Sequence, residues 1–368
     1  MRALLPVLLS LAATAPAADY LVFTGAYTGG PVKGIFAFRF STTNGKLSAS
    51  GLAVETPDPS FLVEHPSHRF VYAVNEKEGT VSSFTIDLKR DKLVPLNRVS
   101  SGGKGPCHLA FDHSGKWLAV SNYDDGALAI LPVGSDGKLG DAVAVEHHQG
   151  HGIHPTRQAG PHAHGTVFSP DNRYLLLADL GLDKIFIYGF DGFRGSLTPA
   201  NPAFVATAPG AGPRHLAFHP SGRVLYAINE LNSTIVDYMY NADNAALKPM
   251  ETVTTLPAGY IGANTAAEIA VSVGGTLLYA SNRGNDTIAL FSIDPNMVRL
   301  TPIDHTPVLG QTPRHFAIDP TGSYMFTANQ DSSSMTIFKM QRMTGQLSLD
   351  GRPATAPSPT CVLLVRTK

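Results

Sequence analysis

The sequence predicts an all-β fold, a seven-bladed β-propeller of four-stranded antiparallel blades closed by a C-terminal strand that joins the N-terminal blade. Two observations support this fold. A pattern of 18 residues recurs six times without gaps, and its starts lie 47 to 57 residues apart. The chain also holds 35 Gly and 27 Pro among 368 residues, which suits a fold with many turns. Short strands that repeat every 40 to 50 residues or so are typical of a β-propeller.

The six copies share a short apolar strand, a turn and a second apolar strand that ends on a polar pair. They are PSFLVEHPSHRFVYAVNE from Pro59, PCHLAFDHSGKWLAVSNY from Pro106, AHGTVFSPDNRYLLLADL from Ala163, PRHLAFHPSGRVLYAINE from Pro213, AAEIAVSVGGTLLYASNR from Ala266 and PRHFAIDPTGSYMFTANQ from Pro313.

Each copy supplies half of a blade. In the fourth copy, the strand HLAF is followed by the turn HPSG, whose residues favour a tight hairpin, and then by the strand RVLYAI. A third strand follows the copy, as at Ser233–Tyr240 and Thr287–Asp294. A fourth strand follows a second turn, such as Gly137–Leu139.

The seventh blade is divided between the two ends of the chain. Near the N-terminus, YLVFTGAYTG, GIFAFRFS and GKLSASGLAV match a second, a third and a fourth strand. The missing first strand is SPTCVLLV at Ser358–Val365, where Pro359 takes the place of Pro213. Closing the ring in this way leaves no open sheet edge.

The chain has two cysteines, Cys107 and Cys361. The repeat places them in blades that are not neighbours, too far apart for the Cα separation of about 7 Å that a disulfide allows. We therefore expect two free, buried thiols.

Residues 1–17 have the features of a signal peptide, and residues 18–368 form the single propeller domain. Arg2 precedes the apolar stretch Leu4–Ala13, and Ala15 and Ala17 are the small residues before a cleavage site. We expect an exported protein, periplasmic or secreted, without a membrane span after cleavage; an uncleaved anchor is the alternative. With a net charge of -1 and no basic cluster, we expect no nucleic-acid partner.

Positions that repeat in every blade indicate scaffold, and positions that differ indicate chemistry. One position holds Asn75, Asn122, Asp179, Asn229, Asn282 and Asn329, whose side chains we expect to hold turns. The next position varies: Glu76, Tyr123, Leu180, Glu230, Arg283 and Gln330.

Two positions at the start of the first strand also vary. The earlier one holds Ser60, Cys107, His164, Arg214, Ala267, Arg314 and Thr360, and the later one Phe61, His108, Gly165, His215, Glu268, His315 and Cys361. Because the first strand of a blade lines the central channel, we expect these residues at one mouth of that channel. They form either an asymmetric binding site or a solvated rim with scattered ion pairs.

The segment Glu146–Gly165 holds six histidines: His147, His148, His151, His154, His162 and His164. Histidine is a common metal ligand, but no HExxH or CxxC spacing is present, and we expect no metal and no cofactor. As this segment connects two blades, we expect most of these histidines to be exposed. The repeat favours His162 and His164 as site residues.

Two segments, Gly160–Asp191 and Gly212–Thr234, resemble the seven-bladed β-propeller lactonase family, which includes the propeller-type bacterial 6-phosphogluconolactonases. A fungal carboxy-muconate cyclase is similar in the same segments. The resemblance extends from about Tyr20 to the C-terminus. It implies a site of His, Arg, Glu and a second Arg, which fall on His164, Arg214, Glu230 and Arg283 in this chain.

The resemblance predicts a lactone hydrolase acting on a small sugar-type lactone, with Glu230 or His164 as the base and Arg214 and Arg283 binding the anionic group or oxyanion. We expect the protein to be a monomer. The expected substrate-binding residues are His162, His108, Glu76, Glu268 and Arg314. His215 is assigned to the rim or to packing, since two other blades carry His at its position. Two alternatives stay open: a non-catalytic propeller that binds a sugar acid or a protein, and a metal-dependent lactonase.

Overall fold

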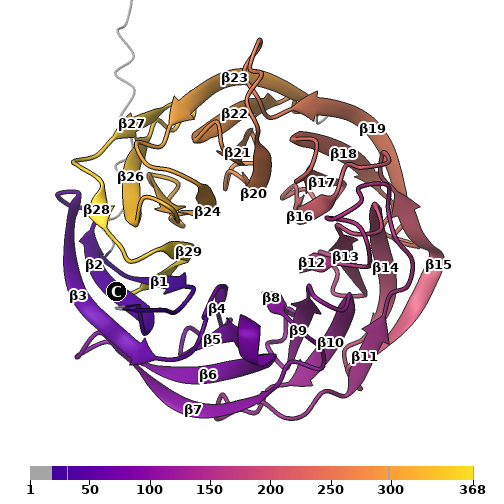
Figure 1. The fold of residues 1–368 in the computed structure, drawn as a ribbon, viewed down its shortest axis with the longest axis horizontal. Helices are drawn as coiled ribbons and strands as arrows, with labels where there is room; N and C mark the ends of the chain where they lie inside the picture. The colour runs from indigo at the N-terminus through magenta and orange to yellow at the C-terminus, as the bar shows by residue number, and fades with distance from the viewer. Residues whose placement is uncertain (1–18, 31, 297–298, 368) are drawn as a thin grey trace, which may run out of the picture.

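The computed structural model describes residues 19–30, 32–296 and 299–367, which form seven β-sheets arranged as blades of a ring (Figure 1). The sequence-based prediction of a seven-bladed propeller is confirmed. The predicted signal peptide, residues 1–17, lies outside the described residues.

The first three blades have these strands, from the ring axis outward. The first blade comprises β29 (Pro359–Arg366), β1 (Asp19–Ala26), β2 (Gly34–Ser41) and β3 (Lys46–Glu55). The second comprises β4 (Leu62–Glu64), β5 (Phe70–Asn75), β6 (Thr80–Asp87) and β7 (Lys92–Ser100), with the 3-10 helix η1 (Glu76–Glu78) after β5. The third comprises β8 (Pro106–Phe111), β9 (Trp117–Asn122), β10 (Ala127–Pro132) and β11 (Ala144–His147).

The remaining four blades follow the same order. They comprise β12 (Ala163–Phe168), β13 (Tyr174–Asp179), β14 (Lys184–Asp191) and β15 (Ser196–Ala206); β16 (Pro213–Phe218), β17 (Val224–Asn229), β18 (Thr234–Tyr240) and β19 (Leu247–Thr254); β20 (Thr265–Val271), β21 (Leu277–Arg283), β22 (Thr287–Ile293) and β23 (Leu300–Pro307); and β24 (Pro313–Ile318), β25 (Tyr324–Asn329), β26 (Ser334–Met340), β27 (Leu347–Leu349) and β28 (Ala354–Thr355).

The C-terminal strand closes the ring as predicted. Strand β29 pairs antiparallel with β1 from Tyr20 opposite Arg366 to Gly25 opposite Cys361. The amide of Thr367 donates to the Asp19 carbonyl at 2.9 Å. The chain ends therefore share one sheet, and β1 keeps no unpaired inner edge.

The apolar core lies between the blades, because both faces of each second strand are covered. All six side chains of β5, β17 and β25 are buried. Each of the hydrophobic clusters in the described residues joins two neighbouring blades, as Tyr226 and Phe291 do. Tyr72 and Tyr279 also donate their hydroxyls to turn carbonyls of the next blade, Gly137 at 2.8 Å and Gly345 at 2.9 Å.

The recurring Asn/Asp position is scaffold, as predicted, and its six side chains are buried. Asn282 donates to the Thr255 carbonyl at 2.7 Å and so ties the end of β21 to the segment entering the blade. Asp179 accepts the amides of His162 at 2.8 Å and Gly181 at 3.0 Å. These short side chains satisfy backbone groups that would otherwise be buried without partners.

Both cysteines are free and buried, which confirms that prediction. Cys107 donates to the Ala163 carbonyl at 3.5 Å, whereas Cys361 lies two blades away on β29. Burial raises the pKa of Cys361 to about 12, so its thiol stays protonated at neutral pH.

Within the residues that the structure describes, no helix has the length and apolar character needed to cross a membrane.

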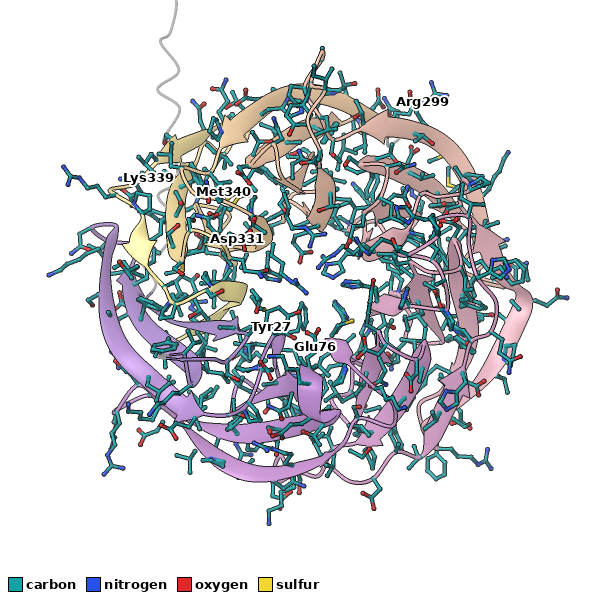
Figure 2. The ribbon with its side chains drawn as sticks, viewed as in Figure 1. Tyr27, Glu76, Arg299, Asp331, Lys339 and Met340 are labelled. Atoms are coloured by element: carbon teal, nitrogen blue, oxygen red, sulfur yellow. The ribbon has the colours of Figure 1, made fainter. Side chains whose placement is uncertain are left out.

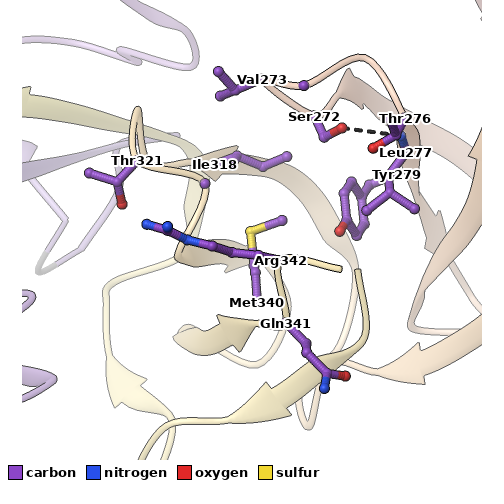
Figure 3. A pocket seen from close by; sticks show the side chains of 12 residues that line it. Ser272, Val273, Thr276, Leu277, Tyr279, Ile318, Thr321, Met340, Gln341 and Arg342 are labelled. Atoms are coloured by element: carbon purple, nitrogen blue, oxygen red, sulfur yellow. Dashed lines mark hydrogen bonds between the residues drawn. The ribbon is translucent and has the colours of Figure 1, made fainter. Parts of the chain in front are cut away.

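A cavity of about 140 Å³ lies between the blade of β20–β23 and the blade of β24–β28 (Figure 3). It is lined by turn residues such as Ser272, Thr321 and Arg342, which follow the ends of β20, β24 and β26. The predicted site residues lie instead near the starts of innermost strands or at the ends of second strands, and none of them lines this cavity.

Candidate active site

The candidate residues meet at one end of the ring axis, where the innermost strands begin; this end is called the mouth. Figure 2 shows Tyr27 and Glu76 near the axis, whereas Arg299 and Lys339 lie toward the outer rim. The innermost strands of neighbouring blades contact one another here, so residues from copies 50 residues apart become neighbours.

A recurring irregularity at the start of the innermost strands brings consecutive side chains to the same side. The pairing of β16 with β17 shifts register between Pro213 and His215, and the same shift occurs between Pro106 and His108 and between Pro313 and His315. In a regular strand, successive side chains point to opposite faces, and a bulge redirects them. As a result, Arg214 Nη1 lies 3.2 Å from His215 Nε2.

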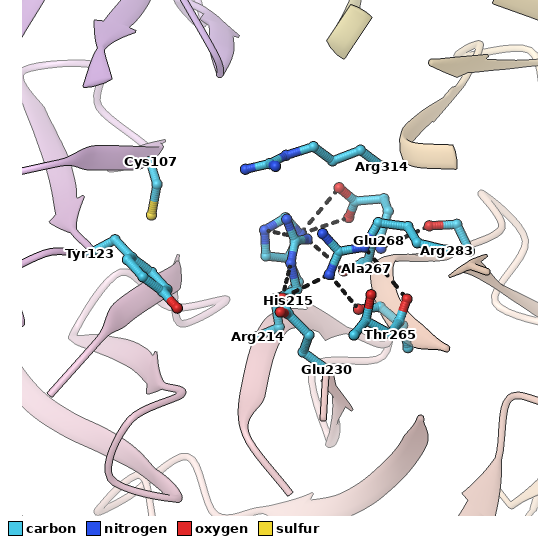
Figure 4. A network of polar contacts seen from close by, with 12 residues as sticks. Cys107, Tyr123, Arg214, His215, Glu230, Thr265, Ala267, Glu268, Arg283 and Arg314 are labelled. Atoms are coloured by element: carbon cyan, nitrogen blue, oxygen red, sulfur yellow. Dashed lines mark hydrogen bonds and ion pairs between the residues drawn. The ribbon is translucent and has the colours of Figure 1, made fainter. Parts of the chain in front are cut away.

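The carboxylate of Glu230 is held by three guanidinium groups, and Figure 4 labels two of them, Arg214 and Arg283. Its Oε2 accepts from Arg214 Nε at 2.9 Å and pairs with Arg283 Nη2 at 2.8 Å. Its Oε1 accepts from Nη2 of Arg157. Glu230 is only 4% exposed and Arg214 only 3%, so this is a buried ionic network. Arg214 also donates to the Ala267 carbonyl of the next blade at 2.7 Å.

The arginines outweigh the effect of burial on Glu230. Burial alone would raise its pKa, but Arg283, Arg214 and Arg157 hold this pKa well below its ordinary value. Burial and the charge of Arg283 lower the pKa of Arg214 to about 10, which still leaves it a cation at neutral pH. Glu230 is therefore a fixed anion whose lone pairs are already engaged, and it is a weak base in this arrangement.

A second buried carboxylate, Glu268, fixes two histidines. His215 Nδ1 lies 3.1 Å from Glu268 Oε2, and His315 Nε2 lies 3.2 Å from the same oxygen. Because Arg214 can only donate to His215 Nε2, the proton of a neutral His215 ring is on Nδ1 and faces Glu268. His315 Nδ1 accepts from the Val362 amide at 3.4 Å, which places its proton on Nε2.

Two further imidazoles lie against His215. The ring centroids of His108 and of His164 are each 5.0 Å from that of His215. His108 Nδ1 accepts from the Thr166 amide at 3.3 Å, whereas His164 Nδ1 is buried with no hydrogen-bond partner in the described residues. Burial first, then Arg214 and His215, lower the pKa of His164 well below its ordinary value. His164 is therefore neutral at pH 7.

Gly165 allows β12 and β16 to approach closely enough to form this cluster. A Cβ at Gly165 would lie 2.5 Å from the Arg214 carbonyl oxygen and 2.8 Å from the His215 Cα. Both atoms belong to the backbone and cannot move aside cheaply. Glycine is thus required at the position where the other copies place a side chain.

The opposite wall of the mouth carries a second polar chain. Arg314 Nη2 donates to the Tyr27 hydroxyl at 2.9 Å, and this hydroxyl donates to Glu76 Oε1 at 2.9 Å. Ser60 donates to Glu76 Oε2. Burial raises the pKa of Glu76, although Ser60, Arg314 and Tyr27 act against it.

The histidine-rich segment divides into structural and site residues. The expectation that most of its histidines are exposed is wrong, since only His147 and His151 are. His148 is buried between Asp179 Oδ2 at 2.6 Å and the Tyr188 hydroxyl at 2.8 Å. His162 stacks on Tyr123 with ring centroids 4.2 Å apart.

Within the described chain, no group of three or more His, Cys, Asp or Glu side chains is arranged to hold a metal ion.

All nine residues predicted for the site lie at the mouth, but in separate groups. Glu230, Arg214 and Arg283 form one network, Glu268 stands beside it, and Glu76 and Arg314 form the opposite wall. The remaining three are the histidines His108, His162 and His164. The sequence-based reasoning expected His215, His315 and Tyr123 at the mouth but did not include them among the catalytic or substrate-binding residues, and it missed Tyr27 and Arg157. A signal for the two histidines was present, since His recurs at one mouth-facing position in three copies.

Comparison with known proteins places this arrangement in context. The family model described as "Lactonase, 7-bladed beta-propeller" matches residues 21–364. A 6-phosphogluconolactonase of Bacillus subtilis is 30% identical over 345 residues, covering 93% of this chain and 97% of the relative. A 6-phosphogluconolactonase of Formosa agariphila is 36% identical over 337 residues, and the match covers 89% of this chain and 94% of the relative. The solved structure of a periplasmic gluconolactonase from Pseudomonas aeruginosa has a TM-score of 0.89 and 33% identity, covering 95% of this chain and 99% of that one.

The Glu230 network predicts a large stability effect for one neutralising change. Glu230→Gln removes the shared anion and leaves buried guanidinium groups unpaired. We expect the free energy of unfolding to fall by about 3 kcal/mol or more, as for other buried pairs broken from one side. Denaturant unfolding followed by circular dichroism measures this effect.

The matched control is Glu55→Gln, because Glu55 is exposed and its nitrogen-oxygen distance to Lys33 is 3.9 Å. An exposed pair of this kind contributes less than about 1 kcal/mol. Equal stability losses in the two variants would contradict the network.

Proposed function

The chain belongs to the family of seven-bladed β-propeller lactonases, and from this premise we propose that it hydrolyses a small sugar-type lactone to the corresponding hydroxy acid. One observation carries the proposal: a neutral imidazole with an unengaged nitrogen, His164, lies in the same buried cluster as guanidinium groups held at fixed positions. Hydrolysis of a cyclic ester needs both a proton acceptor for water and a cation for the developing oxyanion.

His164 suits the role of base better than Glu230 does. The oxygens of Glu230 are occupied by Arg157, Arg214 and Arg283, so they have little remaining basicity. The Nδ1 atom of His164 has no partner in the described residues. In the proposed step, His164 takes a proton from water while the water oxygen bonds to the lactone carbonyl carbon.

The arginines stabilise the charge that this attack creates. The carbonyl oxygen becomes an oxyanion, which Arg214 and Arg283 stabilise from positions set by Glu230. The oxyanion then collapses, the ring C–O bond breaks, and the departing alkoxide takes the proton from the His164 imidazolium. The product is the open-chain hydroxy acid, with no net change in protons at the site before the acid ionises.

The opposite wall suits the hydroxyl-rich part of such a substrate. Glu76 and Tyr27 offer an acceptor and a hydroxyl, and Arg314 adds donors beside them. His108, His162 and Glu268 lie on the remaining sides of the mouth and provide further polar contacts. These residues are the proposed binding surface for the sugar ring.

A panel of lactones tests the proposal directly. We expect the purified protein to release acid from at least one aldonolactone, and His164→Gln and Arg214→Met each to lower kcat by about 100-fold or more. Acid release is followed with a pH indicator after subtraction of spontaneous hydrolysis. The control His68→Gln, an exposed histidine paired with Glu64, leaves kcat unchanged.

Two outcomes separate the alternatives. A protein that binds a sugar acid but opens no lactone is a binding propeller rather than an enzyme. Loss of activity after dialysis against a chelator, with recovery on adding a metal, would instead identify a metal-dependent lactonase. Near wild-type kcat in both His164→Gln and Arg214→Met would refute the assigned roles.

We also propose that the protein is exported. Support comes from the charged, apolar and small-residue pattern of residues 1–17, and from the similarity to the periplasmic gluconolactonase of Pseudomonas aeruginosa. On expression of the full chain in a Gram-negative host, the periplasmic fraction should contain protein that begins at Ala18 or Asp19. Mass spectrometry of the N-terminus measures this, and a membrane-bound product that keeps Arg2 would contradict it.

A further inference from the structure

We propose that Arg157 is a substrate-binding residue, which the segment between β11 and β12 holds at the mouth. When substrate binds, the Arg157 guanidinium group leaves the carboxylate of Glu230 and pairs with the substrate instead. This inference rests on the proposed function, because the ligand is the same lactone or its hydroxy acid. The segment, residues 148–162, is called the strap below. Arg157 lies outside the aligned repeat copies, so the comparison of blades did not single it out.

The strap lies in the longest interval between two copies of the repeat. The second and third copies start 57 residues apart, ten more than the shortest spacing of 47. The added length does not extend the sheet, since β11 ends at His147 and β12 begins at Ala163. It instead forms a connection at the end of the ring where the innermost strands begin.

Two buried side chains anchor the strap in one shape. His148, at its start, is held by Asp179 and Tyr188 and stacks on Phe186 with ring centroids 3.6 Å apart. Gln158, which is fully buried, donates to the Leu180 carbonyl at 2.8 Å and to Asp183 Oδ1 at 2.7 Å. Arg157 directly precedes this second anchor, so its backbone position is fixed.

The second anchor also links the strap to the strand that carries Arg214. Asp183 accepts the amide of Gly212 at 2.8 Å as well as the amide group of Gln158. Gly212 precedes β16 by one residue, and its carbonyl accepts the Glu230 amide at 2.7 Å. Arg157, Arg214 and Glu230 are thus held by one continuous set of hydrogen bonds.

Arg157 differs from the other two partners of Glu230 in exposure. Its side chain is 38% exposed, against 3% for Arg214 and 13% for Arg283. It is also the partner that binds Oε1, whereas the other two share Oε2. If the Arg157 guanidinium group moves away from Glu230, the carboxylate still pairs with Arg214 and Arg283, and no buried charge is left unpaired. Arg157 is therefore the guanidinium that can be exchanged at least cost.

The surroundings of Arg157 indicate the chemistry of its ligand. Its Nη2 also donates to the Tyr123 hydroxyl at 3.3 Å, and Tyr123 lies edge-on to His164 with ring centroids 5.8 Å apart. A planar guanidinium beside a phenol binds oxygen acceptors well, above all a carboxylate in two hydrogen bonds. The carbonyl oxygen and ring oxygen of a lactone, or the carboxylate of the acid it becomes, provide such acceptors.

The test compares kinetics with equilibrium binding in the full-length mature protein. We expect Arg157→Gln to raise KM for the lactone and Kd for gluconate by about tenfold, the effect of losing a charged hydrogen bond. The value of kcat should change less than about threefold, because the proposed chemistry uses other residues. Arg157→Lys, which keeps the charge but loses the planar fork, should give an intermediate KM. Gln158→Ala should shift KM in the same direction with Arg157 still present.

Arg194→Gln is the matched control, since Arg194 is an exposed arginine paired with Asp191 in the β14–β15 turn. Its KM and Kd should equal the wild-type values. Unchanged KM and Kd in Arg157→Gln would overturn the inference, as would a fall in kcat without any change in KM.

Calorimetry measures the Kd for gluconate without requiring turnover, so it tests Arg157 separately from the proposed hydrolysis. If the wild-type protein opens no lactone but gluconate binding depends on Arg157, the proposed function fails and the inference stands. Absence of both turnover and gluconate binding overturns both.

Discussion

The mouth of this propeller depends on one buried carboxylate. Glu230 follows β17, yet its partners come from β16, from β21 and from the strap. Burying guanidinium groups as little exposed as Arg214 strongly destabilises a folded protein unless a counter-charge and fixed acceptors accompany them. Glu230 provides that charge, and by doing so it joins two blades and a connecting segment at one point.

The arginines in turn determine the state of the histidines. The pKa of His108, His164 and His215 is lowered well below the ordinary value, first by burial and then by neighbouring cations or imidazoles. Neutral rings can accept hydrogen bonds from amides and guanidinium groups, which His108 and His215 do. The site thus combines fixed cations with uncharged proton acceptors, and hydrolysis of an ester requires both.

The repeat predicted the blades because strand, turn and Asn position recur in each copy. It placed the positions of Arg214 and His215 at the mouth but could not predict that their side chains touch, because a regular strand would send them to opposite faces. The register shift at the start of β16 brings them together, and no residue pattern marks that shift. His215 was assigned to the rim or to packing because two other blades carry His at its position. Arg157 and Tyr27 were missed because they lie outside the aligned copies, and the burial of His148 depends on Asp179 and Tyr188 in the next blade.

Burial, together with the neighbouring arginines, keeps His164 uncharged and ready to accept a proton, and the pH dependence of kcat/KM measures this state of the imidazole. This parameter reports the ionisation of the free enzyme, and a neutral aldonolactone does not itself titrate. Because the pKa of His164 is lowered, the imidazole stays deprotonated as the pH falls through 6.5. We expect kcat/KM to stay constant as the pH falls through 6.5 and to decrease only at lower pH. A half-maximal value near pH 6.5, the midpoint of an ordinary histidine, would contradict it.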